Sequence, residues 1–328
     1  MKYLIVIILS LFLFSVMTNF VYSQKSDSPK TGMEGMQYKI QPKFVKNTYR
    51  SYKFSEVTKV TRQLSDSSTK SYTRDCLYYM TIRVPDNPVE GFQKVVVTLD
   101  SLLYKFTDDT LKIEYFTQDE KKRPPRSFDF EATSVPLNRQ FNMTYSPYGE
   151  VAKIESDEFT ALREYMEDQG PKLKKKDEMK NFIWHDGIVD SRLINLTEIK
   201  KLIFPNYALP LDSIWKTPFA IQIDYKDYYD TVKAKIAEYN GGNYTIEATS
   251  ENLKPVKRES YFYYIPKTGI VDSCKGGGLV RISLNPRGII TKVEEEFYLK
   301  NFSKIEEEIF TEKVEVKCTW DYLGQFAM

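Results

Sequence analysis

The chain contains one histidine, His185, in the run WHDG at 184–187. A histidine beside an aspartate can serve as a general base, but the side chains of adjacent residues seldom face each other. We therefore interpret His185 as a loop or surface residue. A single histidine also excludes zinc and iron sites that need several. These observations predict no catalytic residue and no metal ligand.

Carboxylates occur in two runs, Glu294–Glu296 and Glu306–Glu308. Such groups could form a glycosidase pair or a calcium site. Runs of glutamate on strands and loops are mostly solvated, so we expect no cofactor. A hydrolase that uses carboxylates alone remains an alternative. The run CKGGG at 274–278 has the glycine content of a phosphate loop without its spacing, and is interpreted as a flexible hairpin tip.

The three cysteines, Cys76, Cys274 and Cys318, allow at most one disulfide within the chain. Cys274 and Cys318 lie in the same half of the sequence and are the first candidate pair. Three unpaired thiols are the alternative.

Two stretches have the pattern strand, turn, strand: Asn142–Glu155 (NMTYSPYGEVAKIE) and Arg281–Glu294 (RISLNPRGIITKVE). In both, proline sets the φ angle of a type I turn and glycine follows where the chain reverses. The similarity indicates either an ancient duplication into two meanders or two unrelated hairpins. Both interpretations stay open.

Alternation of apolar and polar residues predicts many short strands separated by turns. The clearest are Tyr49–Val57, Cys76–Val84, Phe92–Phe106, Tyr229–Tyr239 and Ile309–Tyr322, and Phe128–Ala132 is included as a lead into the first hairpin. A load of 24 Tyr and 20 Phe also favours pleated surfaces.

Between the two strand-rich halves the periodicity becomes helical. Ser156 is a good N-cap for a helix over 156–168, and further helices are predicted over 177–184 and roughly 190–203. The predicted fold is mainly β with a helical insert (α+β), an antiparallel, strongly curved sheet or half-barrel. Its two similar meanders are 38–155 and 208–328, and the insert, 156–207, carries helices at roughly 156–203 packed on or in the sheet.

The N-terminus has one lysine, an apolar run and a small residue at Ser23, which predicts a signal peptide over 1–23 and a flexible tail over 24–37. An uncleaved anchor is the competing interpretation. No cysteine follows Ser23, so we expect an exported protein, periplasmic or extracellular, that is not a lipoprotein and has no membrane span after cleavage. The net charge of +2 gives no field that would attract nucleic acid. The sequence leaves the oligomeric state open.

The order of these parts resembles an uncharacterised family of secreted proteins of Bacteroidetes-type bacteria. The resemblance rests on Gly149-Glu150-Val151 before the helical insert, and on Leu209-Pro210 followed by Asp212-Ser213-Ile214-Trp215 at the start of the second half. It implies a sheet curled over helices, similar to the half-barrel lipoprotein-carrier folds, with no assigned activity.

Together these features predict a non-enzymatic binding or structural protein. In its sharpest form, the concave face of the sheet holds an apolar, lipid-like ligand. The alternatives are the carboxylate hydrolase and a surface protein that docks partners through its strand edges.

Overall fold

The computed structural model describes residues 37–86, 92–146, 151–169, 182, 184–197, 203–205, 207–263, 265–306 and 308–328. The predicted signal peptide, nearly all of the predicted tail, the turn centre of the first hairpin and most of the predicted helix 177–184 lie outside these residues.

The described elements are, in chain order, β1 Thr48–Gln63, β2 Thr69–Val84, β3 Gln93–Asp108, β4 Lys112–Phe116, α2 Phe128–Ser134, β5 Gln140–Tyr145, β6 Val151–Glu155, α3 Asp157–Gln169, α5 Asp190–Asn195, β7 Ile214–Ile223, β8 Lys226–Asn240, β9 Asn243–Ser250, β10 Lys254–Pro255, β11 Glu259–Phe262, β12 Ile265–Leu284, β13 Ile290–Ile305 and β14 Glu308–Ala327.

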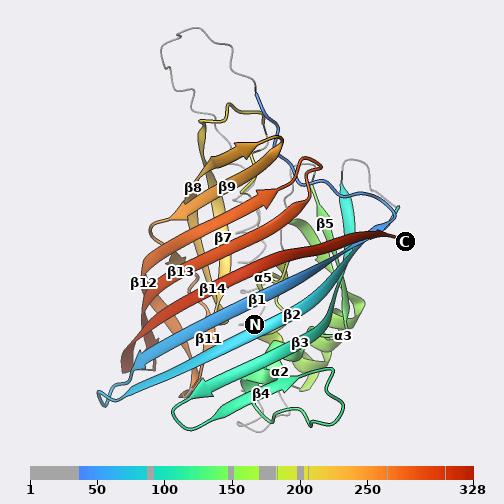
Figure 1. The fold of residues 1–328 in the computed structure, drawn as a ribbon. Helices are drawn as coiled ribbons and strands as arrows, with labels where there is room; N and C mark the ends of the chain where they lie inside the picture. Colours follow the sequence, from blue (N-terminus) through green and yellow to red (C-terminus); the bar gives the residue numbers. More distant parts are fainter. Residues whose placement is uncertain are drawn as a thin grey trace. The chain divides into compact units, whose positions relative to one another are not determined.

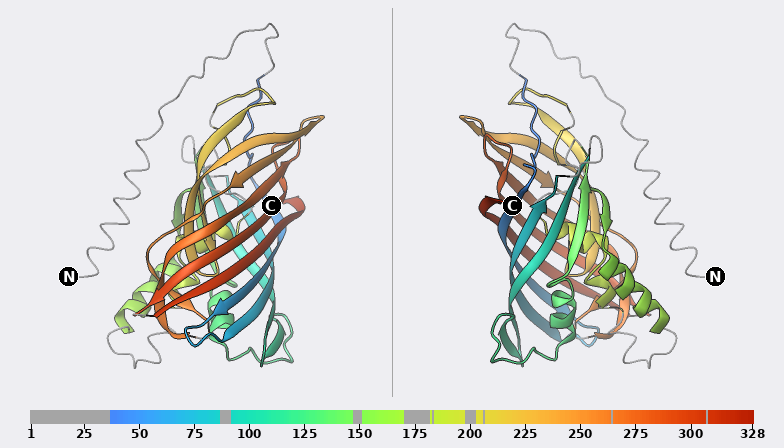
Figure 2. Two further views of the ribbon diagram at one scale, coloured as in Figure 1. Left: turned by 90° about the vertical axis from the view of Figure 1, so that its left-hand side faces the viewer. Right: turned by 90° about the vertical axis from the view of Figure 1, so that its right-hand side faces the viewer.

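Over the described residues, 14 strands form one open sheet in the order β10-β8-β9-β12-β13-β14-β1-β2-β3-β5-β6, with β4, β7 and β11 off this path. The pairs between these strands are antiparallel, and Figure 1 shows the long strands side by side in one layer. The sheet curves so strongly that Asp224, between β7 and β8, receives a hydrogen bond of 2.8 Å from Tyr72 on β2, far away in the strand order. Figure 2 shows this curvature from two sides. The predicted fold class is confirmed.

The two repeated hairpins occupy different places in this sheet. β5 and β6 form one end of the strand order, whereas β12 and β13 lie within it. The division into two meanders stays a prediction.

Strand alternation sets which side chains are buried. On β1, Tyr52 and Phe54 are fully buried, while Lys53 between them is partly exposed. Phe54 stacks on Trp320 of β14 and on Tyr78 of β2, with ring centroids 4.3 Å and 5.7 Å away. Because β1 pairs with β14 on one side and β2 on the other, these rings join the first and last strands of the chain, which are neighbours in the middle of the sheet.

The interpretation of residues 274–278 as a hairpin tip is wrong, because they lie inside β12. Gly276 has φ +123°, and a Cβ there would lie 2.1 Å from the Tyr298 carbonyl oxygen. A Cβ on Gly277 would lie 2.1 Å from the Ser250 carbonyl oxygen. The glycines permit this close approach where the partner of β12 changes from β11 to β9.

The helix α3 confirms the predicted helix at 156–168, since the Ser156 hydroxyl accepts the Phe159 N–H at 3.3 Å. α5 covers the start of the helix predicted at 190–203, and 198–202 lie outside the described residues. The strand predicted at 128–132 is wrong. It is part of α2, in which Asp129 and Thr133 share the buried face and the Thr133 hydroxyl donates to the Asp129 carbonyl oxygen at 2.7 Å.

Candidate functional site

Eight charged side chains are buried on the concave side of the sheet and contact one another; we call them the interior ion-pair network. Their side chains are at most 7% exposed. Four are cations and four are anions, so the network is balanced. The cations are Arg62, Arg74, Arg192 and Lys226, and the anions are Glu56, Asp129, Asp224 and Glu312.

Arg74 lies at the centre of the network because it points inward from β2 towards three carboxylates. Its Nη1 atom lies 2.7 Å from Asp129 Oδ1, and its Nη2 atom lies 3.1 Å from Asp224 Oδ1 and 3.6 Å from Glu56 Oε1. The Tyr225 ring lies under the guanidinium, 4.9 Å from its centroid. Three separate elements, α2, the β7–β8 corner and β1, therefore meet on one arginine.

The β7–β8 corner brings Asp224 into this position. Asp224 and Tyr225 have φ +49° and +62°, the left-handed conformation of a two-residue hairpin turn, although neither is glycine. The Tyr72 hydroxyl and the Lys226 ammonium both donate to the Asp224 carboxylate, at 2.8 Å and 2.7 Å. These contacts hold a backbone conformation that costs free energy in isolation.

Two further arms of the network connect other elements to the sheet. Arg192 of α5 lies 2.8 Å from Glu56 Oε2 on β1. Arg62 of β1 pairs with Glu312 of β14 through two of its nitrogens, and Lys226 Nζ lies 3.9 Å from the other oxygen of Glu312. The network thus joins strands that the hydrogen-bond ladder alone does not connect.

Two of the carboxylates, Glu56 and Asp224, are held ionised. Burial acts to raise the pKa of Glu56, but Arg192 and Arg74 outweigh it and the pKa is lowered. Burial likewise acts to raise the pKa of Asp224, but Lys226 and Arg74 lower it overall. A general acid at neutral pH needs a raised pKa, so neither group is suited to donate a proton.

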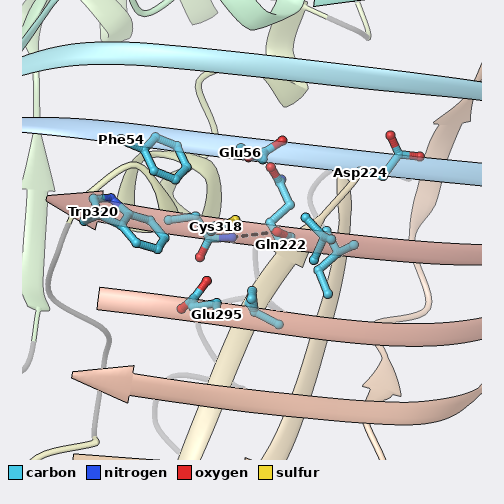
Figure 3. Close-up of a pocket in the computed structure, with 11 residues that line it drawn as sticks. Phe54, Glu56, Gln222, Asp224, Glu295, Cys318 and Trp320 are labelled. Carbon is cyan, nitrogen blue, oxygen red and sulfur yellow. Dashed lines mark hydrogen bonds between the residues drawn. The ribbon is translucent and has the colours of Figure 1, made fainter. Parts of the chain in front are cut away.

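A small cavity adjoins the network (Figure 3). One wall of the cavity is formed by three residues that lie opposite one another on adjacent strands: Glu295 of β13, Cys318 of β14 and Glu56 of β1. Cys76 of β2 continues this row outside the cavity. The eleven lining residues are Phe54, Glu56, Asn195, Ile221, Gln222, Ile223, Asp224, Glu295, Val316, Cys318 and Trp320. The cavity has about 10 Å³ of space for the centre of a water molecule, which is room for about one water.

Across the cavity from β1, β13 and β14 lie α5 and β7, which we call the α5–β7 layer. β7 pairs with β8 and so belongs to the same curved sheet. The Asn195 amide donates to the Gln222 carbonyl oxygen at 2.7 Å, the dashed contact in Figure 3. Trp320 of the sheet donates from Nε1 to the Leu196 carbonyl oxygen at 3.2 Å. Together with the ion pair between Arg192 and Glu56, these bonds hold the layer against the concave face.

The predicted disulfide between Cys274 and Cys318 is wrong, because neither cysteine forms a disulfide in the structure. Cys274 lies on β12 opposite Asn301, and Cys318 lies on β14 opposite Glu295, with β13 between them. Two strand spacings are about 9.5 Å. That is beyond the reach of a disulfide.

The other residues considered for chemistry are dispersed. His185 is exposed, which confirms its interpretation as a surface residue. In the glutamate runs, Glu295 is buried, whereas Glu296, Glu306 and Glu308 are exposed. Over the described residues, no group of three or more His, Cys, Asp or Glu side chains could hold a metal ion. No helix in the same residues is long and apolar enough to cross a membrane.

Sequence reasoning missed the network, although part of it has a signal. Arg62 and Arg74 fall on the same parity as the apolar residues Val60 and Tyr72 of their strands, so alternation alone places their charges inside. Asp129 carried a misleading signal, since alternation in 128–132 indicated a strand. Asp224 has no sequence signal that would place it opposite Arg74.

No family model and no curated protein matches the chain. Among solved structures it is similar to lipovitellin, from a study of lipid–protein interactions, with 9% identity and TM-score 0.45; the match covers 87% of this chain but only 26% of lipovitellin. The translocator domain of the autotransporter NalP from Neisseria meningitidis has 6% identity and TM-score 0.21, and the match covers 84% of this chain and 88% of that domain. A domain named for outer-membrane lipoprotein sorting, from Vibrio parahaemolyticus, has 8% identity and TM-score 0.12, and the match covers 84% of this chain and 85% of that domain. These values are too low to assign a family.

Proposed function

We propose that the chain is an exported, non-enzymatic binding protein of the cell envelope. Its ligand is apolar and lipid-like, and is held inside the curved sheet, between β1, β13 and β14 on one side and α5 and β7 on the other. The observation that carries the non-enzymatic part is the charge balance of the interior ion-pair network. Each of its carboxylates contacts an arginine or a lysine. Groups neutralised in this way stabilise a fold and are poorly placed to act on a substrate.

The apolar side chains around the cavity support the choice of ligand class. Phe54 and Trp320 line it from the sheet, and Ile221 and Ile223 line it from β7. Since there is room for about one water molecule, a lipid-sized ligand requires α5 and β7 to move away from β1, β13 and β14 on the other side of the cavity. Apolar walls with a few fixed polar groups are typical of small-molecule sites.

The alternatives receive less support from the described residues. The hydrolase hypothesis needs inward-facing carboxylates near one another, and Glu56 and Asp224 do share Arg74, but their pKa values are lowered. Docking through a strand edge is disfavoured at β7, where Pro218 lacks the N–H that a partner strand would use.

Native mass spectrometry of protein purified without detergent from the envelope of a bacterial host tests the proposal. We expect lipid-sized adducts on the wild-type protein. Ile223→Trp fills the space opposite the sheet and should abolish them, whereas Ile214→Trp, on the same strand but 71% exposed, should keep them. Circular dichroism checks that both variants fold, and Val316→Phe is a milder replacement for the first. A bare protein mass in the wild type, or adducts that persist in Ile223→Trp, would contradict the proposal.

A further inference from the structure

A second, partly buried cluster lies outside the network, where Arg258 contacts two aspartates. Its Nε atom lies 2.6 Å from Asp227 Oδ2 on β8, and its Nη1 atom lies 2.9 Å from Asp186 Oδ1. Its Nη2 atom donates to the Tyr225 carbonyl oxygen at 3.0 Å. All three guanidinium nitrogens are therefore engaged, and the contact joins the segment 184–197 to the sheet.

This cluster is not balanced, in contrast to the interior network. It has two carboxylates and one guanidinium, a net charge of −1. Asp186 is 2% exposed. Its Oδ2 atom and Asp227 Oδ1 are both buried with no hydrogen-bond partner among the described residues. A buried oxygen without a donor costs free energy, most when the group is charged.

Among the described residues, Arg258 alone forms an ion pair with Asp186, although the charge of Lys226 also acts to lower the pKa of Asp186. On β8, the Lys226 ammonium is bonded to Asp224, and on α3, Arg163 lies 3.1 Å from Asp190. From α2, Glu131 accepts the Trp184 Nε1–H at 3.1 Å, Asp129 pairs with Arg74, and the neighbouring His185 is exposed. The backbone at Gly187 packs closely against α2, because a Cβ on Gly187 would lie 2.4 Å from the Ala132 carbonyl oxygen.

We propose that Asp186 and Arg258 form a pH-sensitive tie that holds the segment 184–197 against the sheet more tightly in mild acid than at neutral pH. Protonation of Asp186 removes the uncompensated charge and gives the cluster the hydrogen-bond donor that its two oxygens lack. The contact to Arg258 persists, because the other oxygen of a carboxylic acid still accepts a hydrogen bond.

The direction of the effect follows from linkage. Burial raises the pKa of Asp186 from 3.8 to about 6. Arg258 and, less strongly, Lys226 oppose the rise, and Asp227 adds to it. The docked segment therefore binds the proton more tightly than an open segment whose Asp186 is solvated. As pH rises from 4.5 to 7, the opening equilibrium constant of the segment should increase about 25-fold, and then level off.

Hydrogen exchange of the full-length protein, followed by mass spectrometry and corrected for intrinsic rates, measures this opening between pH 4.5 and 7. Wild-type peptides from 184–197 should lose protection about 25-fold as pH rises, while peptides from β1 and β14 should not. Asp186→Asn should stay protected at both pH values. Asp190→Asn, in the same segment but with a side chain 61% exposed, should behave like wild type.

Asp227→Asn is the second variant, and it decides the matter if Asp186→Asn does not fold. Removal of the neighbouring negative charge should lower the pKa of Asp186 and shrink the pH response of the segment. The proposal is overturned if protection of 184–197 is independent of pH in wild type, if it falls in acid, or if Asp186→Asn or Asp227→Asn keeps the full wild-type response.

Discussion

Replacement of Arg74 by methionine tests whether the interior ion-pair network is part of the stability of the fold. Arg74 is 2% exposed and contacts Asp129, Asp224 and Glu56, so its loss leaves four carboxylates with three cations. Removal of one partner from a buried ion pair costs about 3–5 kcal/mol. Because three carboxylates lose a contact at once, we expect the upper part of this range, a large fraction of the roughly 5–15 kcal/mol that stabilises a typical protein.

Urea unfolding followed by circular dichroism and tryptophan fluorescence measures the change in the free energy of unfolding. Arg281→Met is the matched control, since Arg281 makes a 2.9 Å pair with Glu247 on the exposed side, and it should leave the midpoint nearly unchanged. In the double variant Arg74→Met with Asp129→Asn the charge count is three against three, and part of the stability should return, at least about 1 kcal/mol. A stability of Arg74→Met equal to that of wild type, or a double variant that is no better than the single one, would refute the reasoning.

Three further predictions concern single positions. Tyr72→Phe removes a hydrogen bond to the Asp224 carboxylate, and should lower the free energy of unfolding by about 1–3 kcal/mol in urea titrations; no change would show that the bond is not needed. Gly277→Ala should lower the free energy of unfolding by about 1–3 kcal/mol, because its Cβ would lie 2.1 Å from the Ser250 carbonyl oxygen. Gly324→Ala should be tolerated, because the nearest atoms to its Cβ belong to the Phe326 ring, at 3.2 Å. Equal thermal midpoints for the two variants would contradict this account. Thiol labelling of unfolded, unreduced protein should count three cysteines outside any disulfide, and a count of one would show that a disulfide had formed. Labelling of native Cys274 should be slow at pH 8 because burial raises its pKa to about 12.

Most of the fold could be predicted from the sequence, whereas the site could not, because strand patterns are local and the site depends on tertiary contacts. Period-two alternation is local, so strands such as β1 and β14, and the cap at Ser156, could be recognised from neighbouring residues. The same signal failed at 128–134, where Asp129 and Thr133 are buried by tertiary contacts that a short alternating run cannot report. The turn predicted from the glycines of β12 was wrong for another reason. Glycine is needed there because the backbone passes close to Ser250 and Tyr298, and not because the chain reverses.

The network depends on contacts between residues that are distant in the sequence. Arg74 and Asp224 meet only because the sheet curls back on itself, and Asp186 meets Arg258 only because the segment 184–197 packs near the start of β11. The parity of a strand can indicate that an arginine points inward. It does not indicate which carboxylate will be opposite, so the site could not be predicted as a site.

A crystal structure of the protein purified from the envelope of a bacterial host, without added lipid or detergent, tests the central claim most directly. The proposal predicts elongated apolar density between β1, β13 and β14 on one side and α5 and β7 on the other. This density should contact Phe54 and Trp320, with Asn195 and Gln222 displaced from the cavity. The account would be contradicted by a structure in which α5 and β7 remain packed against β1, β13 and β14 as in Figure 3 and the cavity holds no more than a water molecule.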